Sequence, residues 1–282
     1  PLIHYSNPNY EFIHGDITDP AVQDSMLEDV DCVLHLAAVV GEPASNKFPE
    51  LTKKINEDAS IAIIDKVIKK KIANFFFFST CSNYGVANTV ANEESELHPL
   101  SPYSETKINV ERYILSHAEE FNWIICRLST VYGPSPRMRL DLTVNDFAYK
   151  AYHDKLIDIF LPESYRPYIH VYDLARVILH LMTHASTLGK TVYNVGFNTE
   201  NYQKIEIAHS TQKKIDGVKI EILKSGGDKR DYKVDFSKLA KATGLSNMFN
   251  VYNTVDQLVR LFSLAEFNDN DRISFNNAFP LS

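Results

Sequence analysis

The chain has 282 residues, of which 44% are hydrophobic and 23% charged, and this composition excludes a disordered or collagen-like protein. Acidic residues outnumber basic ones by 36 to 29, so the net charge of −7 gives no general attraction to nucleic acid or to an anionic membrane. The cysteines Cys32, Cys81 and Cys126 have no C-x-x-C spacing and predict neither a disulfide framework nor a zinc site. No apolar stretch is long enough to cross a bilayer, and we expect a cytoplasmic protein.

Short apolar runs alternate with longer segments of helical periodicity in the first half of the chain. The predicted strands are residues 11–14, 32–36, 75–79 and 123–128. The predicted helices are residues 21–27, 49–70 and 103–120. Apolar strands separated by helices are typical of a sheet covered on both faces, so the pattern predicts an α/β protein with a doubly wound parallel sheet.

Beyond Tyr132 the alternation becomes less regular. We predict a loop at 133–139, helices at 142–152, 173–184 and 202–213, strands at 157–161, 191–195 and 218–223, and two terminal helices. These segments predict a smaller α+β lobe that follows the sheet.

Tyr103 and Lys107 lie four residues apart, directly after Ser101 and Pro102, which are suited to the start of a helix. The spacing places both side chains on one helical face. An ammonium beside a phenol favours the phenolate, so we expect the pKa of Tyr103 to lie below its ordinary value of about 10. Tyr103 is therefore a candidate base, although a surface tyrosine beside a solvated lysine is the alternative.

The apolar run of residues 75–78 ends abruptly in Ser79 and Thr80. Parallel sheets bind ligands at the carboxyl ends of their strands. The sequence therefore predicts that both hydroxyl groups lie at a site, and the alternative is an ordinary hydroxyl-rich turn.

Five segments together resemble the extended short-chain dehydrogenase/reductases, specifically their NAD-dependent nucleotide-sugar epimerase/dehydratase family. They are residues 31–38 (DCVLHLAA), 79–85 (STCSNYG), the Tyr103–Lys107 pair, 127–134 (RLSTVYGP), and 166–171 (RPYIHV) with Asp173. The resemblance covers nearly the whole chain and implies a Rossmann-like sheet. It assigns residues 1–130, with the returning segment 165–195, to a dinucleotide-binding lobe, and residues 131–164 and 196–282 to a substrate-binding lobe.

One feature of the family is absent. Its members open with a strand, a G-x-x-G-x-x-G turn and a helix that hold the cofactor pyrophosphate. Here only Gly15 and Gly41 precede Gly85, and residues 1–16 resemble the approach to the family's third strand. We therefore expect that the first βαβ unit, about 40 residues, is either truncated or part of a leader that this sequence does not include. Weak dinucleotide binding by this chain alone is the expected consequence, and the residues present do not distinguish NAD from NADP.

The resemblance implies binding roles for individual residues. The cofactor-binding positions are Asp16, Ile17, Leu36, Ala37, Ala38, Asn56, Ser79, Tyr103 and Lys107. The substrate-binding positions are Thr80, Thr130, Arg166 and Arg230. The two arginines match partners of the substrate phosphates, a role suited to a planar and permanently charged donor. The alternatives are helix–strand packing for the two alanines, a solvated asparagine for Asn56, and surface charge for the arginines. Arg137, Arg139 and Asn145 lie in the variable substrate region and receive no role.

The implied chemistry is transient oxidation of a nucleotide sugar at C4, with NAD as the cofactor. Tyr103 acts as the base, Lys107 lowers its pKa and holds the cofactor ribose, and Thr80 hydrogen-bonds the reacting oxygen. In the family's 4,6-dehydratases an Asp–Glu pair follows the catalytic threonine, whereas this chain has Cys81 and Ser82 there. We therefore rank a 4-epimerase first, a 4-keto reductase or 4-dehydrogenase second, and a 4,6-dehydratase third.

A hypothesis of a different class is a regulatory protein that binds a dinucleotide without catalysis. Such relatives usually lose the tyrosine or the lysine, and this chain has both. The family resemblance also suggests a homodimer. No metal site is predicted, and we interpret His35 as a core residue because no second ligand lies at a suitable spacing.

Overall fold

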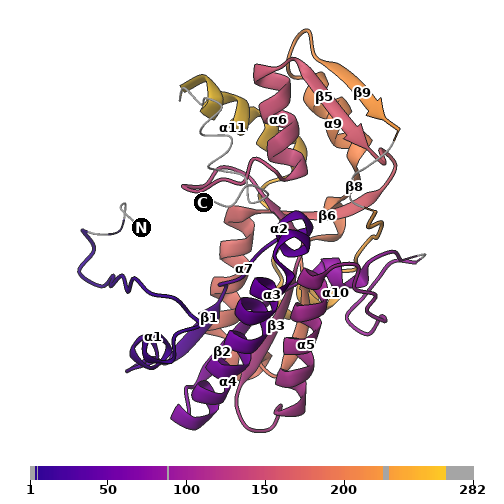
Figure 1. Cartoon of the computed structure of the whole chain (residues 1–282). Coiled ribbons are helices and arrows are strands. Elements are labelled where there is room, and N and C mark those ends of the chain that lie inside the picture. The colour runs from indigo at the N-terminus through magenta and orange to yellow at the C-terminus, as the bar shows by residue number, and fades with distance from the viewer. Residues whose placement is uncertain (1–3, 5, 88, 225–228, 265–282) are drawn as a thin grey trace.

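The computed structural model describes residues 4, 6–87, 89–224 and 229–264 (Figure 1). Its larger lobe is built on a parallel sheet with the strand order β1-β2-β3-β7. These strands are β1 Cys32–His35, β2 Asn74–Thr80, β3 Trp123–Leu128 and β7 Thr191–Val195. Because every pairing is parallel, the carboxyl ends of the strands lie along one edge of the sheet and bring the residues that follow them together.

Helices cover both faces of this sheet. They are α1 Pro20–Met26, α4 Ala59–Lys70 and α5 Pro102–Ser116 on one face, and α7 Val171–Thr183 and α10 Ser237–Thr243 on the other. The run of phenylalanines in β2 follows from this arrangement, because side chains alternate along a strand. Phe75 and Phe77 pack with α4 and α5, whereas Phe76 and Phe78 pack with α7. The predicted doubly wound α/β sheet is confirmed.

The helix predicted at 49–70 consists of three consecutive segments. They are α3 Pro49–Lys53, the π-helical turn η2 Lys54–Asp58 and α4. The π-helical turn carries Asn56, whose buried side-chain amide bonds to both backbone groups of Val39, at 2.7 Å to the nitrogen and 2.9 Å to the oxygen. Asn56 therefore fixes the loop that follows β1, and the solvated-asparagine alternative is excluded.

The smaller lobe lies beyond β3 and combines helices with short strands (Figure 1). α6 Thr143–His153, α9 Lys204–Gln212 and α11 Val251–Leu264 share one apolar cluster, in which Val144, Ile207 and Leu258 are completely buried. β5 Leu156–Phe160 pairs in parallel with β9 Lys219–Leu223. A further sheet has the order β4-β6-β8, with β4 Thr130–Tyr132, β6 Tyr165–His170 and β8 Asn201–Gln203, and β6 leads directly into α7.

The strand predicted at 11–14 is wrong. These residues are irregular, and Phe12 and Ile13 are 45% and 43% exposed. A strand needs a neighbour for its backbone hydrogen bonds, and within the described residues none pairs with this segment.

Conversely, β4, β6 and β8 are not among the predicted strands. β4 and β8 have three residues each, too few to show a periodicity, and Pro167 in β6 argues against a strand. The helix predicted at 202–213 therefore begins only after β8. The short helical turns α2 Glu42–Lys47, η3 Cys81–Tyr84, α8 Ala185–Leu188 and η4 Asn198–Glu200 are likewise additional to the predicted elements.

The two lobes share the later part of the chain. Residues 237–243, which the sequence assigns to the substrate lobe, form α10, and Leu239 packs in the cluster that covers the parallel sheet. Two terminal segments lie outside the described residues. They are residues 1–3, which belong to the segment that resembles the approach to a third strand, and residues 265–282. Among the helices in the described ranges, none is both long and apolar enough to cross a membrane.

Replacing Phe75 by alanine tests the role of β2 in the core. Phe75 is completely buried and its ring lies 6.1 Å from that of Phe121. We expect Phe75→Ala to lower the free energy of unfolding by about 3–5 kcal/mol, because it removes a large apolar side chain and leaves a cavity. Leu115→Ala on the exposed face of α5 is the control and should change it by less than about 0.5 kcal/mol. Urea unfolding followed by circular dichroism measures both values, and equal losses would contradict the assignment.

Candidate active site

The beginning of α5 places the tyrosine–lysine pair at the edge of the sheet. Ser101 caps the helix by accepting a hydrogen bond from the Ser104 nitrogen at 3.4 Å, and Pro102 is its first residue. Tyr103 and Lys107 are 9% and 2% exposed, respectively. The alternative of a surface tyrosine beside a solvated lysine is therefore excluded.

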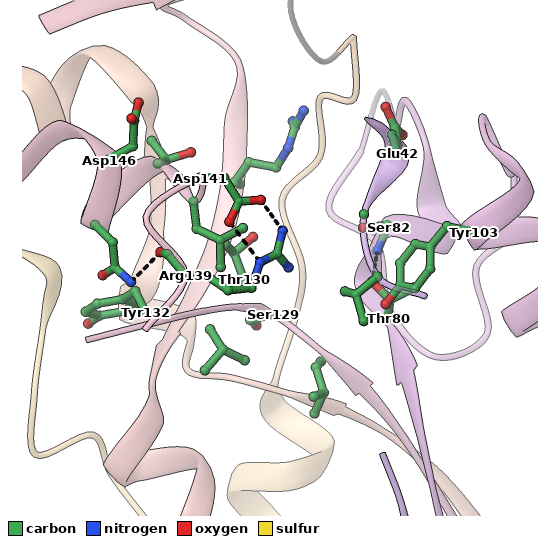
Figure 2. Close-up of a pocket in the computed structure, with 18 of the residues that line it drawn as sticks. Glu42, Thr80, Ser82, Tyr103, Ser129, Thr130, Tyr132, Arg139, Asp141 and Asp146 are labelled. Carbon is green, nitrogen blue, oxygen red and sulfur yellow. Dashed lines mark hydrogen bonds and ion pairs between the residues drawn. The ribbon is translucent and has the colours of Figure 1, made fainter. Parts of the chain in front are cut away.

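Thr80 ends β2 and faces this helix. Its hydroxyl oxygen accepts a hydrogen bond from the Ser82 nitrogen at 3.0 Å and so caps the short helical turn η3. The Thr80 hydroxyl also lies beside the phenol of Tyr103 (Figure 2), and as a hydrogen-bonding partner it lowers the pKa of that phenol. A threonine and a tyrosine that the sequence separates thus form one pair at the carboxyl end of the strand.

A cleft of about 890 Å³ opens at this edge of the sheet and extends to α6 and α9 of the smaller lobe. The predicted site residues that line it are Leu36, Ala38, Ser79, Thr80, Tyr103, Lys107, Thr130, Arg166 and Arg230. The structure therefore brings together the tyrosine–lysine pair, the hydroxyl groups at the strand ends and both arginines.

The other predicted residues do not line the cleft. Asp16 is exposed, and hydrogen bonds from Thr18 hold the pKa of its carboxyl below the usual range. Ile17 packs against the apolar cluster beneath α4, and Ala37 is exposed beyond β1. Asn56 acts on the loop after β1 through its two bonds to Val39.

The expected effect of Lys107 on the pKa of Tyr103 is not observed. Burial raises the pKa of Tyr103, and the opposing contributions come from the hydrogen bond to Thr80 and from the charges of Arg139 and Arg230. The ammonium of Lys107 instead donates to the Phe78 carbonyl oxygen at 2.9 Å. Burial also lowers the pKa of Lys107 to about 8. The spacing in the sequence could not show that the lysine is committed to a backbone oxygen.

The loop between β4 and α6 brings further charged residues to the cleft. Arg139 pairs with Asp141, with 3.0 Å between its Nε and a carboxylate oxygen (Figure 2). Asn145 holds this loop by donating to the Arg139 carbonyl oxygen at 2.9 Å and accepting from the Gly133 nitrogen at 3.0 Å. The sequence assigned no role to these residues. Their position in or just after the loop that follows β4, the strand that begins with Thr130, is the feature that could have revealed them.

Both predicted phosphate partners are held by neighbouring side chains. Arg166 is 4% exposed, and its guanidinium carbon lies 5.2 Å from the centroid of the Tyr232 ring. Arg230 donates to the Ser82 hydroxyl, and its Nε lies 3.2 Å from a carboxylate oxygen of Glu42. Glu42 and Tyr232 line the cleft and are not among the predicted residues. The surface-charge alternative is excluded for Arg166, and Arg230 is only half-buried.

Other titratable residues near the sheet belong to the core. His35 lies in contact with the Ser60 hydroxyl at 2.8 Å and near the rings of Phe75 and Phe77. Burial lowers the pKa of His35 to about 3, so it is neutral. Across the residues that the structure describes, no group of three or more histidine, cysteine, aspartate or glutamate residues is placed to hold a metal ion.

A doubly wound parallel sheet with a tyrosine–lysine helix facing a hydroxyl residue at its carboxyl edge defines a short-chain dehydrogenase/reductase fold of the extended kind. The chain belongs to the NAD dependent epimerase/dehydratase family, whose model matches residues 3–196.

Individual relatives carry both reaction types of this family. Over 177 residues the chain is 31% identical to an uncharacterized UDP-glucose epimerase of Bacillus subtilis, a match that covers 61% of this chain and 55% of the relative. It is 28% identical over 207 residues to a trifunctional UDP-glucose 4,6-dehydratase, 3,5-epimerase and reductase of Arabidopsis thaliana, which covers 70% of this chain and 30% of that protein. The chain therefore spans about half of the first relative and under a third of the second.

Solved structures show the same fold. The UDP-glucuronic acid 4-epimerase of Bacillus cereus, solved with UDP-glucuronic acid and NAD, superimposes with a TM-score of 0.84. The match covers 93% of this chain and 84% of that protein, at 24% sequence identity.

Lys107→Met tests whether the buried ammonium of Lys107 lowers the stability of the folded protein. The substitution replaces a buried ammonium by an apolar side chain of similar length. We expect it to raise the free energy of unfolding by about 2 kcal/mol at pH 7, after allowing about 1 kcal/mol for the lost hydrogen bond to Phe78.

The stability difference between Lys107→Met and the wild-type protein should depend on pH. The pKa of Lys107 is about 8 in the folded protein and 10.5 in the unfolded chain, so wild-type stability rises between these values as folding releases the proton. The advantage of the variant should be complete below pH 8 and disappear towards pH 10.5. Urea unfolding at pH 7 and pH 10 measures it, and a pH-independent difference would contradict this assignment.

Proposed function

We propose that the chain is a nucleotide-sugar 4-epimerase that acts through a transient 4-keto sugar, with NAD as its cofactor. The observation that carries this proposal is that Thr80, Tyr103 and buried Lys107 line one large cleft at the carboxyl edge of the sheet. The family name supports NAD as the cofactor, and the UDP-glucose relatives support a substrate in which a sugar is attached to a nucleoside diphosphate.

The residues present fit the nicotinamide–ribose half of NAD. Leu36 and Ala38, at the end of β1, line the same cleft as Tyr103 and Lys107. An ammonium has three donors, so Lys107 can hold a ribose hydroxyl while it keeps the Phe78 carbonyl oxygen. Bound NAD would supply hydride acceptance and return. The adenine half is less well matched, because the sequence has no glycine-rich turn and Asp16 does not line the cleft.

Tyr103 and Thr80 provide the proton transfer. Tyr103 removes the proton of the sugar C4 hydroxyl, and Thr80 holds the same oxygen by a hydrogen bond. Burial raises the pKa of Tyr103, which makes its phenolate a strong base that forms with difficulty. The Thr80 hydrogen bond and the positive charges of Arg139 and Arg230 offset part of this effect.

The charge of the cleft favours a diphosphate. Of the residues that the structure describes, seven basic and three acidic ones line it, whereas the chain as a whole carries a net charge of −7. A local excess of positive charge attracts an anionic ligand and speeds its association. Arg166 and Arg230 are the residues we assign to the phosphates, and Thr130 to the sugar, because all three line the cleft.

The residues after Thr80 favour epimerisation over dehydration. Removal of water from the sugar requires groups that take and return protons at neighbouring carbons. Cys81 is completely buried, donates to the Arg127 carbonyl oxygen at 3.2 Å, and has a thiol pKa raised by burial. Ser82 accepts a hydrogen bond from Arg230. Neither can replace a carboxylate, so a 4-keto reductase or 4-dehydrogenase is second and a dehydratase third.

The volume of the cleft is compatible with an epimerase. A 4-keto sugar must turn in the site before hydride returns to its other face. The volume of about 890 Å³ lies near the upper end of the range of small-molecule sites, about 300–1,000 Å³, and leaves room for such a turn.

Product analysis with the full-length protein tests this function. After incubation with NAD and UDP-, dTDP- and GDP-sugars, we expect an isomer of unchanged mass, detected by mass spectrometry and by proton NMR at C4. Tyr103→Phe should lower kcat by about 10²-fold or more, because it removes the base. Tyr113→Phe, the same change on the same helix outside the cleft, is the control. A product that has lost water or gained hydrogen, or turnover that survives Tyr103→Phe, would contradict the proposal.

A further inference from the structure

Three consecutive residues at the end of β2 contact three residues of α5 that are spaced by four. The Phe78 carbonyl oxygen accepts from Lys107 at 2.9 Å. The Ser79 hydroxyl donates to the carboxylate of Glu111, and the Thr80 hydroxyl lies beside the phenol of Tyr103 and lowers its pKa. A spacing of four places Tyr103, Lys107 and Glu111 along one helical face. The last three residues of the strand therefore contact three successive turns of the helix.

Glu111 lies at the inner end of this row and is only 2% exposed. Its carboxylate also accepts from Asn83 at 3.0 Å and from two nitrogens of Arg127, at 2.7 Å and 3.1 Å. Arg127 is the register partner of Ser79 on the neighbouring strand β3, so both side chains point to the same face of the sheet. One carboxylate thus joins α5, β2, η3 and β3.

The network continues across the sheet. Arg127 donates to the Tyr84 hydroxyl at 3.0 Å, and Tyr84 donates to the Asn194 side chain on β7 at 2.7 Å. None of Glu111, Arg127 and Asn83 lines the cleft. Their role in the reaction is therefore indirect.

We propose that Glu111 is a positioning residue that fixes the register of α5 against the end of β2 and thereby holds Tyr103 at Thr80. The inference rests on the proposed function, since it assigns these two residues to the reaction. Apolar contacts of α5, such as those of Val110 and Ile114, are non-directional and do not set a register. Hydrogen bonds to a charged group are directional and therefore do set the register of the helix. The register matters because a displacement of about 1 Å at the reacting groups can lower the rate about 10²-fold.

A double substitution separates positioning from stability. Glu111→Leu with Arg127→Met replaces the ion pair by apolar side chains of similar size, a change that often leaves stability unaltered or raised. We expect the folded double variant to lose about tenfold or more in kcat, with KM within about twofold of wild type. Arg127→Lys is the matched control, because it keeps a cation beside Glu111 and leaves the Ser79 and Asn83 bonds in place. Its kcat should stay within about 1.5-fold of wild type.

The ring carbon that bears the hydroxyl of Tyr103 gives a readout that does not depend on turnover. With ¹³C-labelled tyrosine, and Tyr103→Phe to identify the signal, we expect its chemical shift to change in the double variant and not in Arg127→Lys. Should the double variant fail to fold, Asn83→Ala, which removes one donor to Glu111, is expected to shift the same signal and lower kcat about threefold.

Wild-type kcat and an unaltered Tyr103 signal in the folded double variant would overturn the inference. Failure of the proposed function is a separate result, because it would appear as the absence of sugar-nucleotide conversion by the wild-type protein. In that case the Tyr103 signal still decides whether Glu111 sets the register of the helix.

Discussion

The geometry of the site depends on how one helix lies against the end of one strand. Thr80 is the last residue of β2, whereas Tyr103 and Lys107 belong to α5, so the groups that must meet come from different elements. Hydrophobic packing brings α5 onto the sheet but is not directional. The hydrogen bonds that Phe78 and Ser79 form with the helix supply the direction. A buried carboxylate that accepts hydrogen bonds from several elements favours a single arrangement, and that of Glu111 accepts from Ser79, Asn83 and Arg127.

Charge is distributed in a way that favours binding over stability. Basic residues gather in one cleft although the chain as a whole is acidic. Lys107 is buried there, and no carboxylate of the described residues bonds directly to its ammonium. Burial of that ammonium disfavours its charged form, as the lowered pKa shows. Such local conflicts are expected at functional sites, because the requirements of a ligand differ from those of a stable core.

Family membership and the individual side chains answer different questions. The family match establishes the class of enzymes, and its relatives include epimerases and a dehydratase alike. The choice between these outcomes depends on which groups near the sugar can exchange protons. In this chain the two positions after Thr80 are a buried thiol and a hydroxyl engaged with Arg230, which is why we place epimerisation first.

The sequence by itself determined the alternation of strands and helices, the hydroxyl residues at the end of β2 and the helical face that carries Tyr103 and Lys107. These features depend on local periodicity and on spacing within one element. It misjudged residues 11–14, because a strand requires a neighbour that a local pattern cannot reveal.

Only the tertiary structure decided what the site residues contact. In the folded protein Lys107 donates a hydrogen bond to a backbone oxygen, and Glu111 forms a buried ion pair with Arg127. The charges of Arg139 and Arg230 lie close enough to Tyr103 to lower its pKa. These interactions join segments far apart in the chain. Their strength depends on distances and burial that exist only once the sheet and its helices have packed.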